Sequence, residues 1–459
     1  MANQAPTAEL QARDAAHHLH PFTDHAALNR RGTRVITRGE GVYIIDNDGA
    51  RILDGMAGLW NVSLGYGRRE IIDAVRRQLE VLPYYNTFFQ CTHPPATELA
   101  GRIAGLAPPG FSHVFFTSSG SEANDTVLRL VRHYWASLGK PDKEVLIART
   151  NAYHGSTVAG ASLGGMSAMH AQGALPIPGI VHIGQPHWFR EGGGLTPDEF
   201  GIARARELEQ AIERVGEGRV AAFIAEPIQG AGGVIIPPKS YWPEIGRICA
   251  EHEILLVIDE VICGFGRLGH WFGSEHFGVA PDIITFAKGV TSGYQPLGGV
   301  IVSAEVAETL IERGGEFFHG FTSSGHPAAC AAALATLAIL EEEGIIERVR
   351  GETGPYLATR WLRLADHPLV GEARMAGLIG ALELVRSKEP FSFFDDPWTV
   401  GTIARDHSVA GGLVMRAVAD RLIIAPPLVI TRDEIDELIE KARMALDRTL
   451  ETVGAEGLG

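Results

Sequence analysis

Asp259 and Lys288 are the residues of this chain whose types and positions most directly suggest chemistry. Each comes at or just after the end of a short apolar run, Ile254–Ile258 in the first case and Ile283–Phe286 in the second. Apolar runs of this length that are punctuated by Gly and Pro are typical of strands buried on both faces of a sheet. Because ligands collect at the carboxyl ends of parallel strands, the pattern predicts a carboxylate and an amine at one mouth of a sheet.

One cofactor chemistry uses such a pair directly. Pyridoxal 5'-phosphate (PLP) needs a lysine amine that holds it as an imine and a carboxylate that keeps its ring nitrogen protonated. A lysine at the end of a buried strand, such as Lys288, loses charge by desolvation and becomes a better nucleophile. The alternative interpretation is structural, with a lysine that extends into solvent beside a solvated aspartate.

A competing motif lies between the two residues. Gly264–Gly269 matches G-x-G-x-x-G after a strand, and Asp282 follows at about the distance of a ribose contact in a dinucleotide site. That fingerprint has to open a helix, whereas here Gly278 and Pro281 leave no room for a long one. The sequence therefore predicts a glycine-rich loop, and a nicotinamide dehydrogenase is the weaker hypothesis.

Composition sets the broad class. The 459 residues suffice for two or three structural units with a large core, and the net charge of −15 argues against a nucleic-acid or anionic-membrane surface. We see no apolar run of membrane-spanning length and no hydrophobic core of a signal peptide. The cysteines are far apart and favour reduced thiols in a cytoplasm: Cys91, Cys249, Cys263 and Cys330.

The N-terminal part is expected to precede the main sheet. Residues 1–30 predict an arm with one or two short helices, and their histidines make a metal-binding tract conceivable although we expect no metal site: His17, His18, His20 and His25. Thr33–Asp54 predicts a small antiparallel sheet, because its residues alternate around the hairpin turn signal Asp46–Gly49.

A second candidate for ligand binding starts at a strand predicted over His113–Thr117. It runs into Ser118–Glu122 and then into a helix. Free backbone N–H groups, hydroxyls and the helix dipole favour a phosphate at such a place. Ser121 alone would be enough for an ordinary helix cap, so three serines and a glycine favour phosphate binding.

Other polar residues are predicted at the same edge of the sheet. Tyr153 follows a strand over Val145–Ala148, and Glu226 follows a strand over Val220–Ala225. Tyr153 could stack on a flat ring or be structural. Because strands and helices alternate through the middle of the chain, we expect a parallel sheet with right-handed crossovers, interrupted by an excursion rich in Gly and Pro over residues 164–200.

The tail changes character. It predicts amphipathic helices over Glu341–Arg363 and Asp433–Val453, and strands over Ala376–Leu384 and Leu422–Ile424. We expect three segments: an arm and small-domain part at 1–67, a large α/β domain at 68–329, and a smaller α+β domain at 330–459.

Taken together, the motifs resemble the class III aminotransferases of PLP fold type I over essentially the whole chain. The most specific part is the block IDEV, FGR, PDI and AKG, and SSGSEAN, AYHGST, EPIQG and HGFTSSGHP follow in the same order as in that family. The resemblance implies a large domain with a mostly parallel seven-stranded sheet and a smaller α+β domain formed by both chain ends.

The resemblance also implies roles for individual residues. Lys288, Asp259 and Tyr153 would act in catalysis, with Lys288 moving protons, Asp259 pairing with the ring nitrogen and Tyr153 stacking on the ring. The cofactor would be bound by Ser119, Gly120, Ser121, Tyr153, Glu226, Asp259, Val261, Lys288 and Thr322. Thr322 would reach the phosphate of the other subunit, because the family forms homodimers with shared sites; a dimer of dimers is the larger alternative.

Substrate recognition is inferred from Arg416, which resembles the family's flexible arginine for the carboxylate of a keto acid. Its neighbour Arg421 is a rival for that role. Relatives that use ornithine with 2-oxoglutarate usually have a glutamate after the QG of EPIQG, and Ala231 stands there instead. The remaining pocket would be mostly apolar and aromatic, formed by Phe22, Trp60, Phe88, Ala231 and Ile262 beside Tyr153.

We therefore expect a cytoplasmic ω-transaminase that moves an amino group from a primary amine or ω-amino acid to pyruvate by ping-pong kinetics, with (S)-selectivity implied by the resemblance alone. Its partners would be the small-molecule amine donor and keto-acid acceptor, without nucleic acid or membrane. The alternatives are a 2-oxoglutarate-dependent enzyme for ornithine- or GABA-like donors, an aminomutase, a decarboxylase or a racemase. The sequence does not choose among β-alanine, taurine, a polyamine and an arylalkyl amine as the donor.

Overall fold

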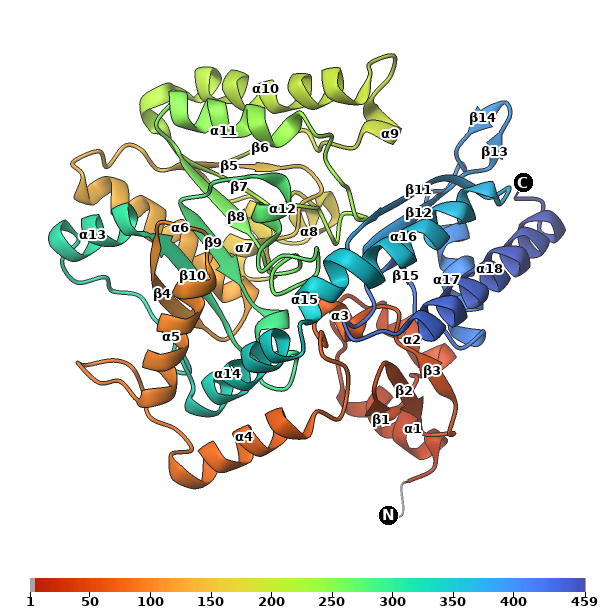
Figure 1. Ribbon diagram of the computed structural model, residues 1–459. Helices are drawn as coiled ribbons and strands as arrows, with labels where there is room; N and C mark the ends of the chain where they lie inside the picture. The colour runs from red at the N-terminus through yellow and green to blue at the C-terminus, as the bar shows by residue number, and fades with distance from the viewer. Residues whose placement is uncertain (1–4, 459) are drawn as a thin grey trace.

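A seven-stranded sheet forms the centre of the protein in the computed structural model, which describes residues 5–458 (Figure 1). Its order is β4-β10-β9-β8-β7-β5-β6, and only β10 runs antiparallel to its neighbours. The strands are β4 (Phe111–Thr117), β5 (Val145–Arg149), β6 (Ile180–Ile183), β7 (Val220–Ala225), β8 (Leu255–Asp259), β9 (Ile283–Phe286) and β10 (Gly298–Ser303). The expected mostly parallel seven-stranded sheet is confirmed.

Helices cover both faces of this sheet, as the continuous apolar runs predict. Alternate residues of β5 face opposite ways: Leu146 packs with α6 (Gly120–Ser137) and Ile147 with α10 (Pro197–Val215). The helix α13 (Ala304–Arg313) lies on the α6 side and α11 (Tyr241–Glu251) on the α10 side. The sheet is therefore closed to solvent on both faces, and its edge at the strand ends is where a ligand can enter.

The two ends of the chain meet in space. In the N-terminal part, β1 (Ile36–Glu40), β2 (Tyr43–Asp46) and β3 (Arg51–Leu53) form the expected antiparallel sheet. Leu53 then joins the tail, because its N–H donates to the Gly412 carbonyl at 2.9 Å and its carbonyl accepts from the Val414 N–H at 2.8 Å.

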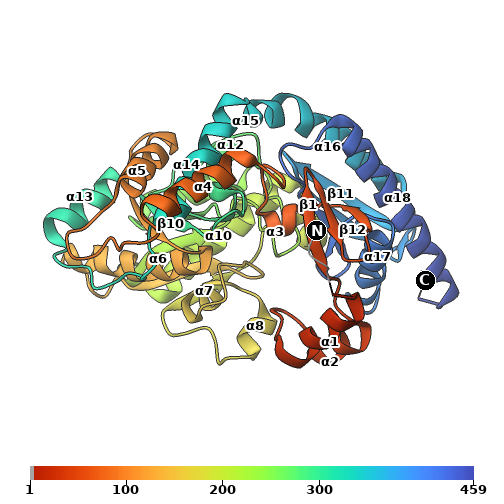
Figure 2. The ribbon, with the colours of Figure 1, turned by 90° about the horizontal axis from the view of Figure 1, so that it is seen from below.

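The tail itself contains a four-stranded antiparallel sheet. Its strands are β11 (Val370–Ala376), β12 (Ile379–Leu384), β16 (Arg421–Ile424) and β15 (Arg416–Ala417). Figure 2 shows α16 (Gly354–Leu362) and α18 (Arg432–Ala455) along the outer side of β11 and β12.

The remaining elements are helices and one small hairpin. They are α1 (Thr7–His17), α2 (His25–Arg31), α3 (Ala57–Trp60), α4 (Arg69–Val81), α5 (Pro94–Leu106), α7 (Val158–Leu163), α8 (Ser167–Ala171), α9 (Trp188–Glu191), α12 (Gly273–Phe277), α14 (Pro327–Glu342), α15 (Ile345–Arg348), α17 (Thr399–Ala410), β13 (Ser387–Lys388) and β14 (Phe391–Ser392). The boundaries at 67/68 and 329/330 stay a prediction; α14, which crosses the second, packs on α4 and α5. Across residues 5–458, none of the helices has both the length and the hydrophobicity needed to cross a membrane.

The sequence predictions missed three features of the local structure. The excursion over 164–200 contains β6, a four-residue edge strand that is too short to show a period among its Gly and Pro neighbours. The strand expected over Ala376–Leu384 is present as β12, but it begins only at Ile379, because Gly377 turns the chain at φ 53° between β11 and β12. The helix expected over Glu341–Arg363 is broken at Gly344, which has φ 59°, and continues as α15, a π-helical turn and α16.

Candidate active site

Most of the charged and polar residues predicted for the site lie at the carboxyl edge of the sheet. Asp259 ends β8 and Lys288 follows β9, while Tyr153 and Glu226 follow β5 and β7. β4 leads into α6, whose N-cap is Ser119. Since β4, β5, β7, β8 and β9 point the same way, five strands deliver side chains to one edge.

The Asp259 carboxylate is buried and accepts three hydrogen bonds. Its Oδ2 accepts from Nδ1 of His154 at 2.7 Å and from Nδ2 of Asn124 at 2.8 Å, and its Oδ1 accepts from the Val261 N–H at 3.0 Å. Burial opposes ionisation, but the hydrogen bonds and the nearby imidazole outweigh it and hold the pKa of Asp259 below its ordinary value. The structure therefore provides a fixed negative charge.

The surroundings of the Lys288 amine disfavour its charged form, whereas those of Asp259 favour its charged form. The residue has φ 48°, an uncommon backbone conformation for a non-glycine residue, and begins a single 3₁₀ turn. Burial lowers the pKa of Lys288 to about 8, although Asp259 and Glu226 act against the shift. A lysine with this pKa is partly neutral near neutral pH and can act as a nucleophile or as a base.

Two basic side chains lie over the Trp60 ring. The ring centroid is 5.4 Å from Nζ of Lys288 and 5.1 Å from Cζ of Arg416. The loop that carries it is folded around Asp54, whose carboxylate accepts from the N–H groups of Met56 at 3.1 Å and Gly58 at 2.6 Å. Trp60 itself has φ 56° and is buried, so the backbone and the packing fix its place beside these two side chains.

Arg416 is a mostly buried cation without an anion. Within the described residues no acidic side chain forms an ion pair with it, and burial lowers its pKa. Its rival Arg421 is engaged instead, with Nε 3.2 Å from Oε1 of Glu383 and Nη1 donating to the Gly232 carbonyl at 2.6 Å. Of the two arginines, only Arg416 is free to accept the carboxylate of a ligand.

The start of α6 forms a close-packed turn. Oγ of Ser119 accepts from the Glu122 N–H at 3.2 Å, and Oγ of Ser121 accepts from the Ser156 N–H at 3.1 Å. A Cβ at position 120 would come within 2.9 Å of the Val261 side chain, so glycine is needed where the two segments touch. The predicted residues Ser119, Gly120, Ser121 and Val261 are thus brought together beside the end of β8.

A hydrogen bond from the backbone of Tyr153 joins it to the Glu226 carboxylate. Oε1 of Glu226 accepts from the Tyr153 N–H at 3.2 Å and Oε2 accepts from the Gly230 N–H at 2.9 Å, while burial raises the pKa of Glu226. The Phe22 ring lies 6.2 Å from the Tyr153 ring, edge to face, and is 74% exposed. The N-terminal arm therefore reaches the edge of the site.

Phe88 and Thr322 are not brought to Lys288 within one chain. They lie together on another surface, where a Cβ at Gly320 would come within 2.7 Å of the Phe88 ring and the Tyr84 hydroxyl donates to the Thr322 carbonyl at 2.7 Å. Thr322 is exposed. By contrast, Ala231 and Ile262 pack with Trp60 in one buried apolar cluster, and their role in a substrate pocket stays a prediction.

Asn124, His154 and Asp54 were missed as site residues. The first two stand inside the motifs SSGSEAN and AYHGST, but nothing in their spacing says that they bind the Asp259 carboxylate from separate segments. Asp54 is the last residue of the segment predicted as a small sheet, and nothing in its sequence context indicates that it organises the Trp60 loop.

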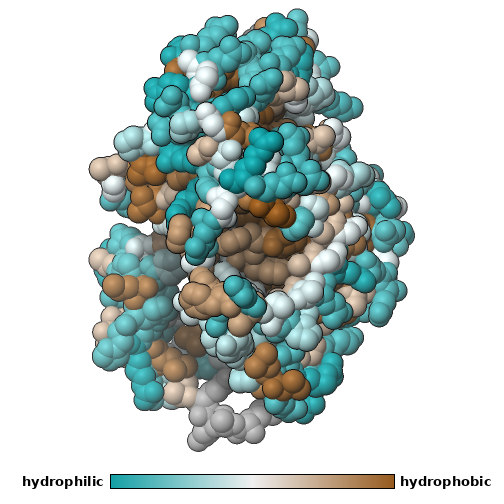
Figure 3. All heavy atoms as spheres, turned by 90° about the vertical axis from the view of Figure 1, so that its left-hand side faces the viewer, coloured by the Kyte–Doolittle hydropathy of each residue, from teal (hydrophilic) through white to brown (hydrophobic). Residues whose placement is uncertain are grey.

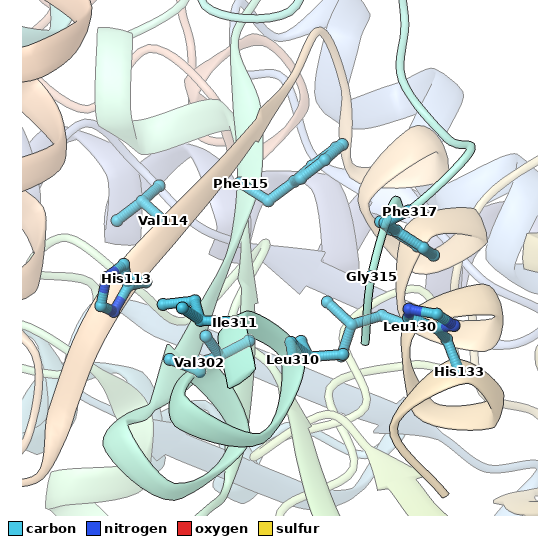
Figure 4. Close-up of a pocket in the computed structure, with 11 residues that line it drawn as sticks. His113, Val114, Phe115, Leu130, His133, Val302, Leu310, Ile311, Gly315 and Phe317 are labelled. Carbon is cyan, nitrogen blue, oxygen red and sulfur yellow. The ribbon is translucent and has the colours of Figure 1, made fainter. Parts of the chain in front are cut away.

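Two other features lie outside this constellation. A cavity of about 190 Å³ between β4, β10, α6 and α13 is lined mainly by apolar side chains such as Val114, Leu130 and Phe317, and none of the predicted site residues lines it (Figure 4). In the N-terminal arm the possible ligand atoms of Asp14, His18 and His20 lie within 4.8 Å of one another. The expectation of no metal site stays a prediction.

Comparison with known proteins gives the family. Residues 26–446 match the family model "Aminotransferase class-III". The chain is 60% identical to the putrescine–pyruvate aminotransferase of Pseudomonas aeruginosa, over 98% of each chain, and 42% identical to the diaminobutyrate–2-oxoglutarate transaminase of Halomonas elongata, over 96% of this chain and 95% of that protein. A solved (S)-enantioselective omega-transaminase from Thermomicrobium roseum superposes with a TM-score of 0.94 at 46% identity, covering 98% of this chain and 100% of that one. The chain belongs to the class III aminotransferases, which use PLP.

Proposed function

We propose that the protein transfers an amino group from a primary amine or ω-amino acid to pyruvate. The observation that carries this proposal is the mostly buried Arg416 guanidinium, which has no acidic partner within the described residues and lies over the same Trp60 ring as the Lys288 amine. A cation in this position needs the carboxylate of a ligand. The 60% identical relative is named for pyruvate as its acceptor, which supports the same choice.

The side chains suit PLP in charge and in donor type. When bound, PLP supplies an electron-withdrawing ring that stabilises negative charge on the carbon next to the amino group. Asp259 would hold the proton on the ring nitrogen, because its carboxylate is kept ionised. Tyr153 and Val261 would flank the ring, and Ser119, Gly120 and Ser121 would bind the phosphate at the start of α6.

Lys288 would move the protons. Its amine would take a proton from the carbon that bears the substrate's amino group and would return a proton to the carbon on the other side of that nitrogen, so the residue would serve as base and then as acid. A pKa of about 8 suits both roles near neutral pH. Glu226 would stabilise the segment of Tyr153, to whose N–H it is bonded.

Both substrates would use one pocket. Arg416 would bind the pyruvate carboxylate through two parallel hydrogen bonds, whereas Trp60, Ala231 and Ile262 offer an apolar wall to a donor that has no carboxylate. Ala231 leaves Arg416 without the acidic resting partner of the 2-oxoglutarate-dependent relatives, which favours pyruvate. We also propose (S)-selectivity, supported by the likeness to the (S)-enantioselective omega-transaminase of Thermomicrobium roseum.

We propose a homodimer in which each subunit completes the other's site. Figure 3 shows the face on the side of α5 and α13, where separate apolar patches interrupt a hydrophilic surface. Phe89 and Phe318 are 89% and 75% exposed, and both belong to the segments that carry Phe88 and Thr322. An interface there would bring Phe88 and Thr322 to the partner's pocket and phosphate. A dimer of dimers is the larger alternative.

We further place the enzyme in the cytoplasm, because its cysteines are all unpaired.

The experiment is a half reaction followed by absorbance. The PLP-loaded enzyme is mixed with an (S)-arylalkyl amine or putrescine without keto acid, and the visible band of the bound cofactor is recorded. We expect the band to bleach, and pyruvate but not 2-oxoglutarate to restore it. Recovery with 2-oxoglutarate alone would replace the proposal by the activity named for the Halomonas elongata relative. No bleaching by any amine would refute it.

A further inference from the structure

Glu383 is a buried acid with an unusual number of cationic neighbours. Its side chain on β12 is 0% exposed, and its carboxylate forms ion pairs with Arg190, with Arg374 at 3.1 Å and with Arg421 at 3.2 Å. Those guanidiniums outweigh burial and lower the pKa of Glu383 to about 2. Burial lowers the pKa of the neighbouring His187 to about 3, so that imidazole stays neutral near neutral pH.

Two of these arginines reach beyond the acid to a backbone loop. Arg374 donates from Nε to the Val234 carbonyl and from Nη2 to the Gly233 carbonyl, both at 2.7 Å. Arg421 donates from Nη1 to the Gly232 carbonyl at 2.6 Å. Three successive carbonyls are therefore held by guanidiniums that share one carboxylate, whereas Arg190 forms no hydrogen bond to this loop in the described part of the chain.

The loop needs this support. Val234 is fully buried at φ 54°, a conformation that is a rare and strained state for a β-branched residue. Such strain persists only where the surroundings fix the backbone, and the bond from Arg374 to the Val234 carbonyl does so. Ala231, in the same loop, packs with Trp60 and Ile262, so a shift of the loop would move one wall of the pocket.

The same cluster also supports the hairpin that carries Arg416. Arg421 closes the turn between β15 and β16, where its N–H donates to the Val418 carbonyl at 3.2 Å and its carbonyl accepts from the Val418 N–H at 2.9 Å. Arg416 pairs with Ile423 in that hairpin. The Glu383 carboxylate thus anchors Arg421, which lies in the same hairpin as Arg416, and through Arg374 it also anchors the loop Gly230–Val234.

A metal is not the reason for this cluster. The possible ligand atoms of His187, Glu372 and Glu383 do lie within 4.8 Å of one another. However, three guanidiniums already neutralise Glu383, and their positive charge repels a cation.

We propose that Glu383, Arg374 and Arg421 form a positioning cluster for the keto-acid subsite: it fixes the loop Gly230–Val234 against the hairpin that carries Arg416. This inference rests on the function proposed above and adds residues that touch neither substrate nor cofactor. The cluster sets how well the enzyme accepts a carboxylate, and it has little influence on a donor without one.

The test is Arg421→Met, with Arg190→Met as the matched control. Both variants remove one guanidinium from the same oxygen of Glu383, but only the first also removes the bond to the Gly232 carbonyl. We expect Arg421→Met to lower kcat/KM for pyruvate about tenfold or more and to change kcat/KM for a neutral arylalkyl amine less than threefold. Arg190→Met should leave both within twofold, while both variants lower Tm. Arg421→Lys keeps a charge and should recover part of the pyruvate value; it also replaces Arg421→Met if that variant does not fold.

The outcomes are distinct. Equal losses for pyruvate and amine, or equal effects of the two Met variants, would overturn the inference, because a purely structural cluster predicts both. If the unmodified enzyme uses 2-oxoglutarate instead of pyruvate, the proposed acceptor is wrong, and the same two variants are compared with 2-oxoglutarate as the carboxylate substrate.

Discussion

Replacing Arg416 by leucine isolates the contribution of the carboxylate subsite. Leucine keeps an apolar side chain beside Trp60 and removes the charge, and no acid within the described residues loses a partner, since none pairs with Arg416. The change should therefore affect ligand binding with little cost in folding. A stability measurement should show a Tm equal to or above that of the unmodified enzyme, because a mostly buried, unpaired cation is removed.

The size of the effect follows from the kind of contact. Loss of one partner from a buried charge pair costs about 2–5 kcal/mol. Arg416 is mostly buried but not sealed from solvent, so the lower part of that range applies, about 2–3 kcal/mol. Since each 1.4 kcal/mol is about a tenfold change, kcat/KM for pyruvate should fall about 30- to 150-fold. Arg416→Lys keeps the charge without the two-point contact and should lose about tenfold.

The assay compares two half reactions of the same protein. In ping-pong kinetics, kcat/KM for each substrate reports its own half reaction, so pyruvate and a neutral arylalkyl amine can be measured independently. We expect the amine value to stay within threefold of the unmodified enzyme. A parallel fall for both substrates would refute the assignment, because it would show that Arg416 supports the whole site and not the carboxylate.

Three further predictions concern the cofactor and the assembly. Lys288→Ala should lower turnover at least about a thousandfold while PLP still binds without a covalent bond, as read from its absorbance; retained turnover would remove the residue from the mechanism. Burial lowers the pKa of Lys288 to about 8, so the fraction of the amine that is neutral increases as the pH rises towards and above that value. The rate at which cofactor-free enzyme takes up PLP should therefore rise with pH and level off above about 8. A midpoint near the ordinary lysine pKa would contradict the burial argument. Dilution below the dimer dissociation constant should inactivate the enzyme, measured by activity and light scattering together, and a fully active monomer would exclude a shared site with Thr322.

The sequence predicted those site residues whose signal is local. Asp259 and Lys288 each follow an apolar run, and such a run predicts both a buried strand and the place where it ends. Ser119–Ser121 follow a strand and open a helix, which is again a local pattern. In a parallel sheet such patterns are sufficient, because the topology brings all strand ends to one edge.

The parts that were not predicted depend on contacts between distant segments. His154 and Asn124 complete the Asp259 site from the loop after β5 and from α6, and only the folded chain shows their bonds to one carboxylate oxygen. The edge strand β6 was missed because four residues carry too little periodicity. In the same way, the placement of Phe88 and Thr322 on a separate surface depends on the fold of two loops and not on either sequence motif.

Arg416 and Arg421 show most clearly what sequence patterns leave undecided. The two residues have the same chemistry, stand five positions apart and flank the same short hairpin, so each could have been the carboxylate-binding arginine. The structure distinguishes them through Glu383 on β12, whose carboxylate forms an ion pair with Arg421 and not with Arg416. Arg416 instead lies over the Trp60 ring, with its Cζ 5.1 Å from the ring centroid. A cation–π contact of this kind stabilises the guanidinium less than a buried ion pair would, and it can be given up when a keto acid arrives. We therefore expect Arg416 to be available to a keto acid, because its contact in this structure is aromatic and not an ion pair.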